Sequence, residues 1–207
     1  SGGAQGARDA ALTIMVGGSS AALERARPLF DLLGPTVIHM GGSGAGQTTI
    51  DADGTLTLDG GRLSGGGVAN QGLIHGNGRI DSPLTNDAGG EIRALTGERM
   101  QFTGGGNTND GEINLLGGTV EFDQDLANNA TGFIGGVGTL IANGGLDNSG
   151  VVAFSETARV FGDVANSATG QIVVAGSGTT TFFDDVVMDP GNMNIEVSGG
   201  SDVVFFG

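Results

Sequence analysis

The stretch that decides the fold runs from residue 109 to residue 150 and reads NDGEINLLGGTVEFDQDLANNATGFIGGVGTLIANGGLDNSG. Short apolar segments alternate in it with clusters of Gly, Asn, Asp and Ser. Segments of this length and punctuation are typical of β-strands separated by turns, and no helical spacing of apolar residues persists. The stretch therefore predicts a succession of short strands.

The turns of this stretch recur throughout residues 48–207. Short turns of the form Asn-x-Gly alternate with longer ones, and consecutive turns lie about 20 residues apart. The corner asparagines are Asn70, Asn86, Asn109, Asn128, Asn148 and Asn166. Asparagine and glycine tolerate the left-handed backbone that such corners are expected to need. Aligned asparagine amides can also hydrogen-bond one another in a ladder, so turn chemistry and an internal ladder both remain open.

Each unit also repeats internally as three apolar segments. The first holds Ile74, Ile92, Ile113, Ile134, Val152 and Ile172 in successive units. The second holds Ile80, Phe102, Phe122, Ile141, Phe161, and Phe182 or Phe183, and the third holds Leu84, Leu126, Leu146, Val164 and Val186.

Three short strands in about 20 residues form one rung of a three-faced parallel β-helix. We therefore predict a mainly β protein whose residues 48–207 form a parallel β-solenoid of six or seven rungs, each burying the apolar residues of its neighbours. An antiparallel sandwich or barrel is the alternative, but it favours turns about 8–12 residues apart.

Residues 1–47 follow a different pattern. Leu12–Val16 is a short apolar run that predicts a buried strand, and Ser19 offers an N-cap oxygen. Apolar residues then recur at helical spacing over 21–33, where Gly34 is expected to end the helix as its C-cap. A second strand is predicted at Val37–Met40. The order predicts an incomplete α/β segment built as one β-α-β crossover.

Three motifs of this segment occur in a suggestive order: Ser1-Gly2-Gly3, then LTIMVGG at residues 12–18, then GxGAGQ at residues 42–47. With them the segment resembles the end of the cofactor domain of the 3-hydroxyisobutyrate dehydrogenase (β-hydroxyacid dehydrogenase) family. The resemblance implies a Rossmann-type fold, NAD or NADP as cofactor, and a substrate carboxylate held by Ser1, Gly2 and Gly3.

Other positions depart from that family. Its Gly-x-Gly-x-x-Gly phosphate loop is not found in residues 1–47, and its catalytic Lys and Asn correspond here to Ile50 and Gly54. We expect the glycines of residues 41–46 to form a turn or linker rather than a phosphate cradle. We therefore expect no dehydrogenase activity and no cofactor, with NAD or NADP relevant only if the chain is a relic of such an enzyme.

Composition excludes several other functions. Residues 48–207 carry all of the net charge of −15, which disfavours nucleic-acid binding. With no Cys and only His39 and His75, a zinc or thiolate site is not expected. No apolar run is long enough to predict a membrane span.

Acidic pairs are the remaining candidates for chemistry. Asp51 and Asp53 are weak calcium candidates because the other ligands of a calcium loop are missing around them. Asp184 and Asp185 are the nearest approach to the carboxylate pair of a polysaccharide-active β-helix enzyme. Adjacent strand residues point to opposite faces, and in a corner the two would be ordinary turn acids.

The solenoid region also resembles the glycine-rich repeats of bacterial autotransporter-like surface proteins. That resemblance implies an extracellular or cell-surface location. We expect a non-catalytic structural or adhesive segment, with other surface proteins or glycans as candidate partners and the oligomeric state left open. The alternatives are a relic of a β-hydroxyacid dehydrogenase and a polysaccharide-active enzyme.

Overall fold

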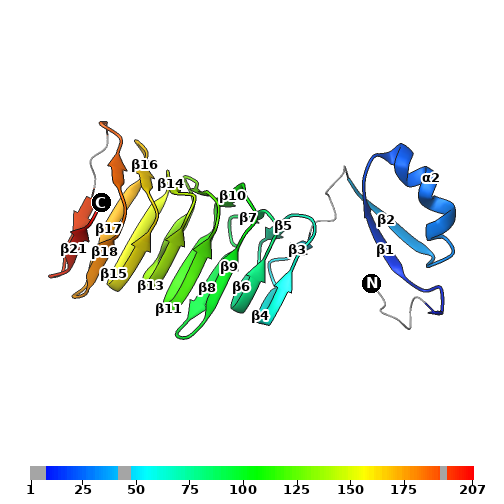
Figure 1. Cartoon of the computed structure of the whole chain (residues 1–207), viewed down its shortest axis with the longest axis horizontal. Coiled ribbons are helices and arrows are strands. Elements are labelled where there is room, and N and C mark those ends of the chain that lie inside the picture. The colour runs from blue at the N-terminus through cyan, green and yellow to red at the C-terminus, as the bar shows by residue number, and fades with distance from the viewer. Residues whose placement is uncertain (1–7, 42–47, 192–194) are drawn as a thin grey trace. The chain divides into compact units, whose positions relative to one another are not determined.

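The computed structural model describes residues 8–41, 48–191 and 195–207. The chain divides into two compact units, one of residues Ser1–Thr48 with Gly65–Gly67 and one of residues Thr49–Ser64 with Val68–Gly207. The first unit is small and contains the helix, whereas the second contains nearly all of the strands (Figure 1).

The first unit is a β-α-β crossover, as predicted. Strands β1 (Thr13–Gly17) and β2 (Thr36–Gly41) pair in parallel, and helix α2 (Ser20–Phe30) connects them. Ser19 caps the helix, because its Oγ accepts a hydrogen bond of 3.2 Å from the Ala22 backbone N–H.

The end of the helix differs from the prediction. Helix α2 stops at Phe30 rather than Leu33, and its C-cap is Asp31 in a right-handed conformation, so Gly34 is not a left-handed cap. After the helix the chain turns back, and the Leu33 carbonyl accepts the Leu12 N–H at 3.2 Å. Gly34 is required by this close approach, since a Cβ there would lie 1.9 Å from the Leu12 carbonyl oxygen.

The second unit consists of two parallel sheets. The eight-stranded sheet holds β3 (Thr48–Ile50), β5 (Val68–Asn70), β7 (Leu84–Asn86), β10 (Asn107–Asn109), β12 (Leu126–Asn128), β14 (Leu146–Asn148), β16 (Val164–Asn166) and β19 (Val186–Met188). The eleven-stranded sheet holds β4 (Thr55–Leu63), β6 (Leu73–Ile80), β8 (Glu91–Leu95), β9 (Arg99–Phe102), β11 (Glu112–Phe122), β13 (Phe133–Ala142), β15 (Val151–Phe161), β17 (Gln171–Val174), β18 (Thr179–Phe182), β20 (Ile195–Val197) and β21 (Asp202–Phe205).

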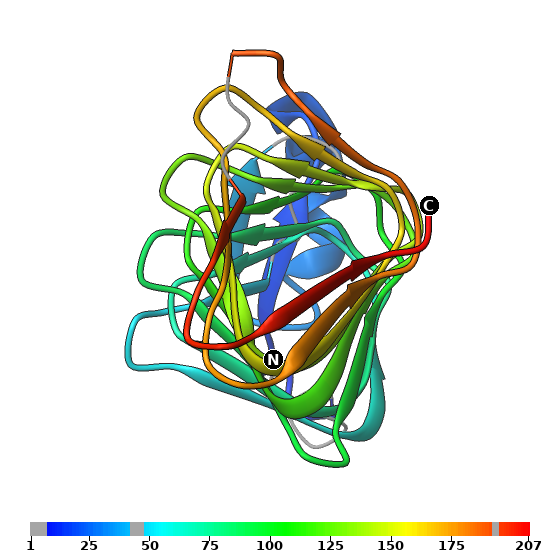
Figure 2. The same ribbon diagram turned by 90° about the vertical axis from the view of Figure 1, so that its left-hand side faces the viewer.

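Each rung contributes one three-residue strand to the first sheet and one long or interrupted strand to the second. Strands such as β11, β13 and β15 shift register midway, and in other rungs the same segment is split in two, as in β8 and β9. The result is a three-faced parallel β-solenoid whose rungs follow one another along the axis (Figure 2). The predicted fold is confirmed, but it has about eight turns rather than six or seven.

The core is a set of residue rows that run from rung to rung. The row predicted for the first segment is confirmed, because its members pair in register and each is at most 1% exposed: Ile74, Ile92, Ile113, Ile134, Val152 and Ile172. Phe102 and Phe122 stack inside the second segment with ring centroids 4.8 Å apart. Burial of such aliphatic and aromatic side chains is the main force that holds the rungs together.

Part of the predicted second row is wrong. The inward residues of the later rungs are Leu140, Val160 and Phe182, which pair in register and are at most 1% exposed. Their neighbours Ile141, Phe161 and Phe183 are only partly buried. Strand alternation accounts for the difference, because each pair of consecutive apolar residues places one member inside and one outside.

Candidate functional site

The corner asparagines form a continuous internal ladder. Each Nδ2 donates a hydrogen bond of 2.7 Å to the Oδ1 of the next asparagine, through Asn70, Asn86, Asn109, Asn128, Asn148 and Asn166. All six side chains are at most 2% exposed. The ladder interpretation is therefore confirmed, whereas the expected left-handed backbone is not found at any of these asparagines. Buried amides are stabilising only when bonded in this way, so the ladder fixes the register of the rungs.

One buried asparagine escaped the sequence prediction. Asn107 is 1% exposed and occupies the inward row that Leu84 and Leu126 fill in neighbouring rungs. Its Nδ2 donates to the Gly104 carbonyl at 2.7 Å, and its Oδ1 accepts the Leu84 N–H at 3.2 Å. The available signal was its spacing of two from Asn109, which places both side chains on the same strand face.

A cluster of charged residues covers the outer face of the early rungs. Asp81 accepts hydrogen bonds from Arg79, from Arg62 and, at 2.8 Å, from the Thr103 hydroxyl. The Arg79 hydrogen bond is the largest cause that lowers the pKa of Asp81 from 3.8 to about 2; burial opposes the shift, while Thr103 and Arg62 add to it. The site is a cross-rung clamp, because Arg62, Asp81 and Thr103 belong to three successive rungs.

The lowered pKa of Asp81 predicts a defined loss of stability in acid. A carboxyl whose pKa is lower in the folded state stabilises the fold above its unfolded pKa and loses that contribution as the pH falls toward the folded value. We expect Asp81→Asn to lower the melting temperature at pH 7, and the difference from the parent chain to shrink between about pH 4 and pH 2. Melting curves followed by circular dichroism check this, and a difference that stays constant down to pH 2 would contradict it.

A second charged group lies on the outer face of the first-segment strands. Arg93 donates to Glu91 through Nε at 2.8 Å, and Asn114 donates to the same carboxylate at 2.9 Å. The hydrogen bond from Arg93 is the main cause that lowers the pKa of Glu91, while partial burial opposes it. The outer polar groups of these rungs therefore bind one another across the sheet.

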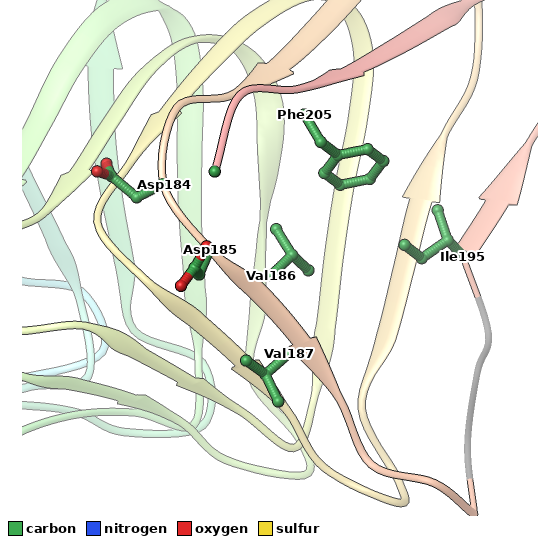
Figure 3. A pocket seen from close by; sticks show the side chains of 7 residues that line it. Asp184, Asp185, Val186, Val187, Ile195 and Phe205 are labelled. Carbon is green, nitrogen blue, oxygen red and sulfur yellow. The ribbon is translucent and has the colours of Figure 1, made fainter.

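The pair Asp184 and Asp185 lies in the corner between β18 and β19 rather than within a strand. Asp184 is held by the preceding rung, because its Oδ2 accepts the Gly162 N–H at 2.7 Å. Both residues border a cavity of about 400 Å³ that is otherwise lined by apolar residues such as Ile195 and Phe205 (Figure 3). Figure 3 shows the two carboxylates directed away from the Phe205 ring, so they do not converge on one point of that cavity.

The remaining candidate residues are not brought together. Asp51 and Asp53 are exposed in the turn before β4. The described part of the chain contains no group of three or more His, Cys, Asp or Glu residues placed to hold a metal ion. His75 Nε2 lies 3.0 Å from the Thr57 hydroxyl, as part of a surface pair.

Two of the sequence-predicted sites fall outside the described residues. These are the proposed carboxylate-binding residues Ser1, Gly2 and Gly3, and residues 42–46 of the glycine-rich run. His39 lies in β2, where its backbone pairs with Val16. Within the described ranges, no helix is both long and apolar enough to cross a membrane.

Comparison with known proteins confirms the dehydrogenase resemblance of the N-terminal segment. Residues 1–42 match the family model described as the NAD binding domain of 6-phosphogluconate dehydrogenase. Over 48 residues the chain is 56% identical to 2-hydroxy-3-oxopropionate reductase of Escherichia coli, and over 47 residues it is 55% identical to NAD-dependent L-serine dehydrogenase of Pseudomonas aeruginosa. A probable 3-hydroxyisobutyrate dehydrogenase of Mycobacterium tuberculosis is 49% identical over 47 residues.

These matches cover a small part of either partner. Each aligned segment is 23% of this chain and 16% of the relative, so the chain spans about one sixth of the length of these enzymes. No solved structure matches the chain.

In the described part of the β-α-β unit, the N-terminus of helix α2 is only partly available to the NAD(P) that these matches imply. A dinucleotide phosphate needs free N–H groups at a helix N-terminus. At the start of α2 the Ala22 N–H is already bonded by the Ser19 side chain, and residues 20–23 of its first turn include no Arg.

Proposed function

We propose that the chain is a non-catalytic structural or adhesive repeat segment of a secreted or cell-surface protein. The observation that carries the proposal is the uninterrupted Asn ladder together with the aliphatic rows beside it. A stack of eight strands in one sheet extends about 34 Å at roughly 4.8 Å per rung. Such a stack is a stiff element whose outer faces are available for contact.

Charge and composition support the same proposal. The solenoid region carries the whole net charge of −15, which suits a solvated repeat surface. Its early outer faces are covered by cross-rung ion pairs such as Arg99 with Glu121, rather than by an open constellation of acid and base. These contacts favour a scaffold over a catalytic surface.

The proposal is tested in cells that produce the protein. Antibody raised against the chain should label intact cells as strongly as permeabilised ones, and protease added outside the cells should remove the signal. A cytosolic enzyme of known location serves as the control for cell lysis. Labelling that requires permeabilisation would contradict the proposed location.

A second candidate is a fragment of an NAD(P)-dependent β-hydroxyacid dehydrogenase, and the family match over residues 1–42 favours it together with the relative aligned over 48 residues. Under our first proposal, calorimetric titration of the full chain with NAD⁺, NADH, NADP⁺ or NADPH is expected to show no saturation up to about 1 mM. A dissociation constant in the micromolar range would instead support the dehydrogenase fragment as the functional part. The P. aeruginosa L-serine dehydrogenase named above is a suitable positive control, as its name states that it depends on NAD.

A further inference from the structure

The late rungs present a row of apolar side chains on the outside of the solenoid. We name Ile141, Phe161, Phe183 and Phe206 the outer Phe column. The Phe161 and Phe183 rings stack with centroids 4.3 Å apart and planes 4° apart, and Phe183 and Phe206 continue the stack at 5.6 Å and 10°. Ile141, Phe161 and Phe183 are only partly buried, so part of each of these side chains is exposed. Such a run of outward aromatic residues exceeds what the core needs.

The same outward row is polar in the early rungs. The residues that precede Ile141 in this row are Arg62, Arg79, Gln101 and Glu121. Each of them is bonded to another side chain on the same face, for example Gln101 to Asp123 at 3.1 Å. The face therefore changes from a polar half, whose side chains bond one another, to an apolar half at Ile141, although Ile141 pairs in register with Glu121 on one side and with Phe161 on the other.

The apolar half has an acidic border. Asp163, Asp184 and Asp185 are exposed in the corner that directly follows Phe161 and Phe183. Residues 160–207 contain six acidic residues and no Arg or Lys. The last cation of the sequence is the exposed Arg159, which lies two residues before Phe161 on the same face of β15, so Phe161 stands between it and this corner along the chain. A partner that reaches both the column and the corner must therefore bring positive charge.

The stacking of the Phe rings indicates which kind of apolar group the partner would bring. Sugars stack on exposed aromatic faces, but Phe161 and Phe183 cover each other's faces and leave mainly their edges outside. The exposed edges of the stacked rings can instead pack against aliphatic and aromatic side chains of a partner protein. We infer that the outer Phe column and its acidic corner bind an extended protein segment that alternates apolar residues with Lys or Arg. This inference does not depend on the cellular location proposed above.

The test uses the full chain and a fluorescein-labelled octapeptide of alternating Leu and Lys, with fluorescence anisotropy as the readout. The parent chain should bind it saturably, and the double variant Phe161→Ser with Phe183→Ser should weaken binding about tenfold or more. Asp185→Asn should weaken binding about two- to fivefold and reduce its dependence on salt. Gln101→Ser, a matched change in the polar half of the same row, should leave the affinity unchanged.

Other outcomes overturn the inference. Equal affinity for the double variant and the parent would mean that charge alone attracts the peptide. Binding of an alternating Leu and Glu peptide would contradict the required positive charge. If light scattering shows that the parent chain is a dimer and the double variant is a monomer, the column binds a second copy of the chain instead of a separate partner. A urea midpoint for the double variant close to that of the parent shows that a loss of binding is not a loss of folding.

Discussion

Replacing one asparagine in the middle of the Asn ladder should strongly destabilise the solenoid. In Asn128→Leu the side chain keeps a similar size, but Asn148 Oδ1 loses its donor, and Asn109 Nδ2 loses its acceptor at 2.7 Å and keeps only the Phe133 carbonyl at 3.2 Å. Both groups are at most 1% exposed, so water cannot replace the missing partner. An orphaned buried polar group costs about 1–3 kcal/mol, and two of them predict a loss of about 4 kcal/mol in the free energy of unfolding. The shift of the urea unfolding midpoint measures it.

Asn129→Ala is the matched control for this prediction. Asn129 is the next residue, but its side chain lies outside the rung and donates to Asp110 Oδ2 at 2.8 Å. Water can satisfy the groups left by its removal, so a loss below about 1 kcal/mol is expected. Equal midpoints for Asn128→Leu and Asn129→Ala would show that the ladder contributes no more than a surface hydrogen bond. That result would remove the main support for a stiff scaffold.

The regular spacing of the corner asparagines made the solenoid predictable. A strand-turn pattern that returns about every 20 residues specifies both the rung and its stacking, because each rung needs its neighbours to bury Ile113 or Ile134. Spacing alone could not decide between ladder and turn chemistry. That decision depends on whether the Asn128 side chain points in or out, which is set by the register of the neighbouring rung.

The prediction of the second core row was wrong where two apolar residues follow each other in the sequence. Leu140 with Ile141, and Phe182 with Phe183, offer two equally apolar choices, and only the strand alternation set by the rungs on either side selects the inward member. The outward members are the ones that form the outer Phe column. In the sequence, the residues of this candidate interaction surface could therefore not be distinguished from core residues.

The charged clamp around Asp81 was unpredictable for a different reason. Its partners Arg62 and Thr103 lie 19 and 22 residues away in the chain, and stacking alone brings them together. By contrast, the β-α-β fragment could be recognised from contiguous motifs, and the family match over residues 1–42 confirms it. Motifs made of neighbouring residues can be recognised in the sequence directly, whereas contacts between rungs can be predicted only once the register of the strands is known.

The corner glycines should be nearly as sensitive as the asparagines, although for a steric reason. The sequence predicts a left-handed backbone at such corners, and Gly89 adopts it with a φ of +93°, but the aligned glycines beside the Asn ladder do not: Gly72, Gly90, Gly111, Gly132, Gly150 and Gly170. What they share is close approach to the preceding rung. A Cβ at Gly111 would lie 2.3 Å from the Gly90 carbonyl oxygen and 2.5 Å from that of Asp87. Both atoms are backbone, so neither can rotate away.

Gly111→Ala should therefore force two rungs apart where they are hydrogen-bonded, since the Gly90 carbonyl also accepts the Glu112 N–H at 2.9 Å. Overpacking of a rigid interior costs about 1–3 kcal/mol and sometimes more, so we expect a loss of about 3 kcal/mol, read from the urea midpoint. Gly105→Ala is the control, because a Cβ there meets only Gln124 side-chain atoms at 3.7 Å or beyond and its backbone needs no left-handed φ. That change should be neutral or slightly stabilising, since alanine restricts the unfolded chain. If Gly111→Ala were as harmless as Gly105→Ala, the rungs would have to yield at the corner, and the tight stacking on which the scaffold depends would be wrong there.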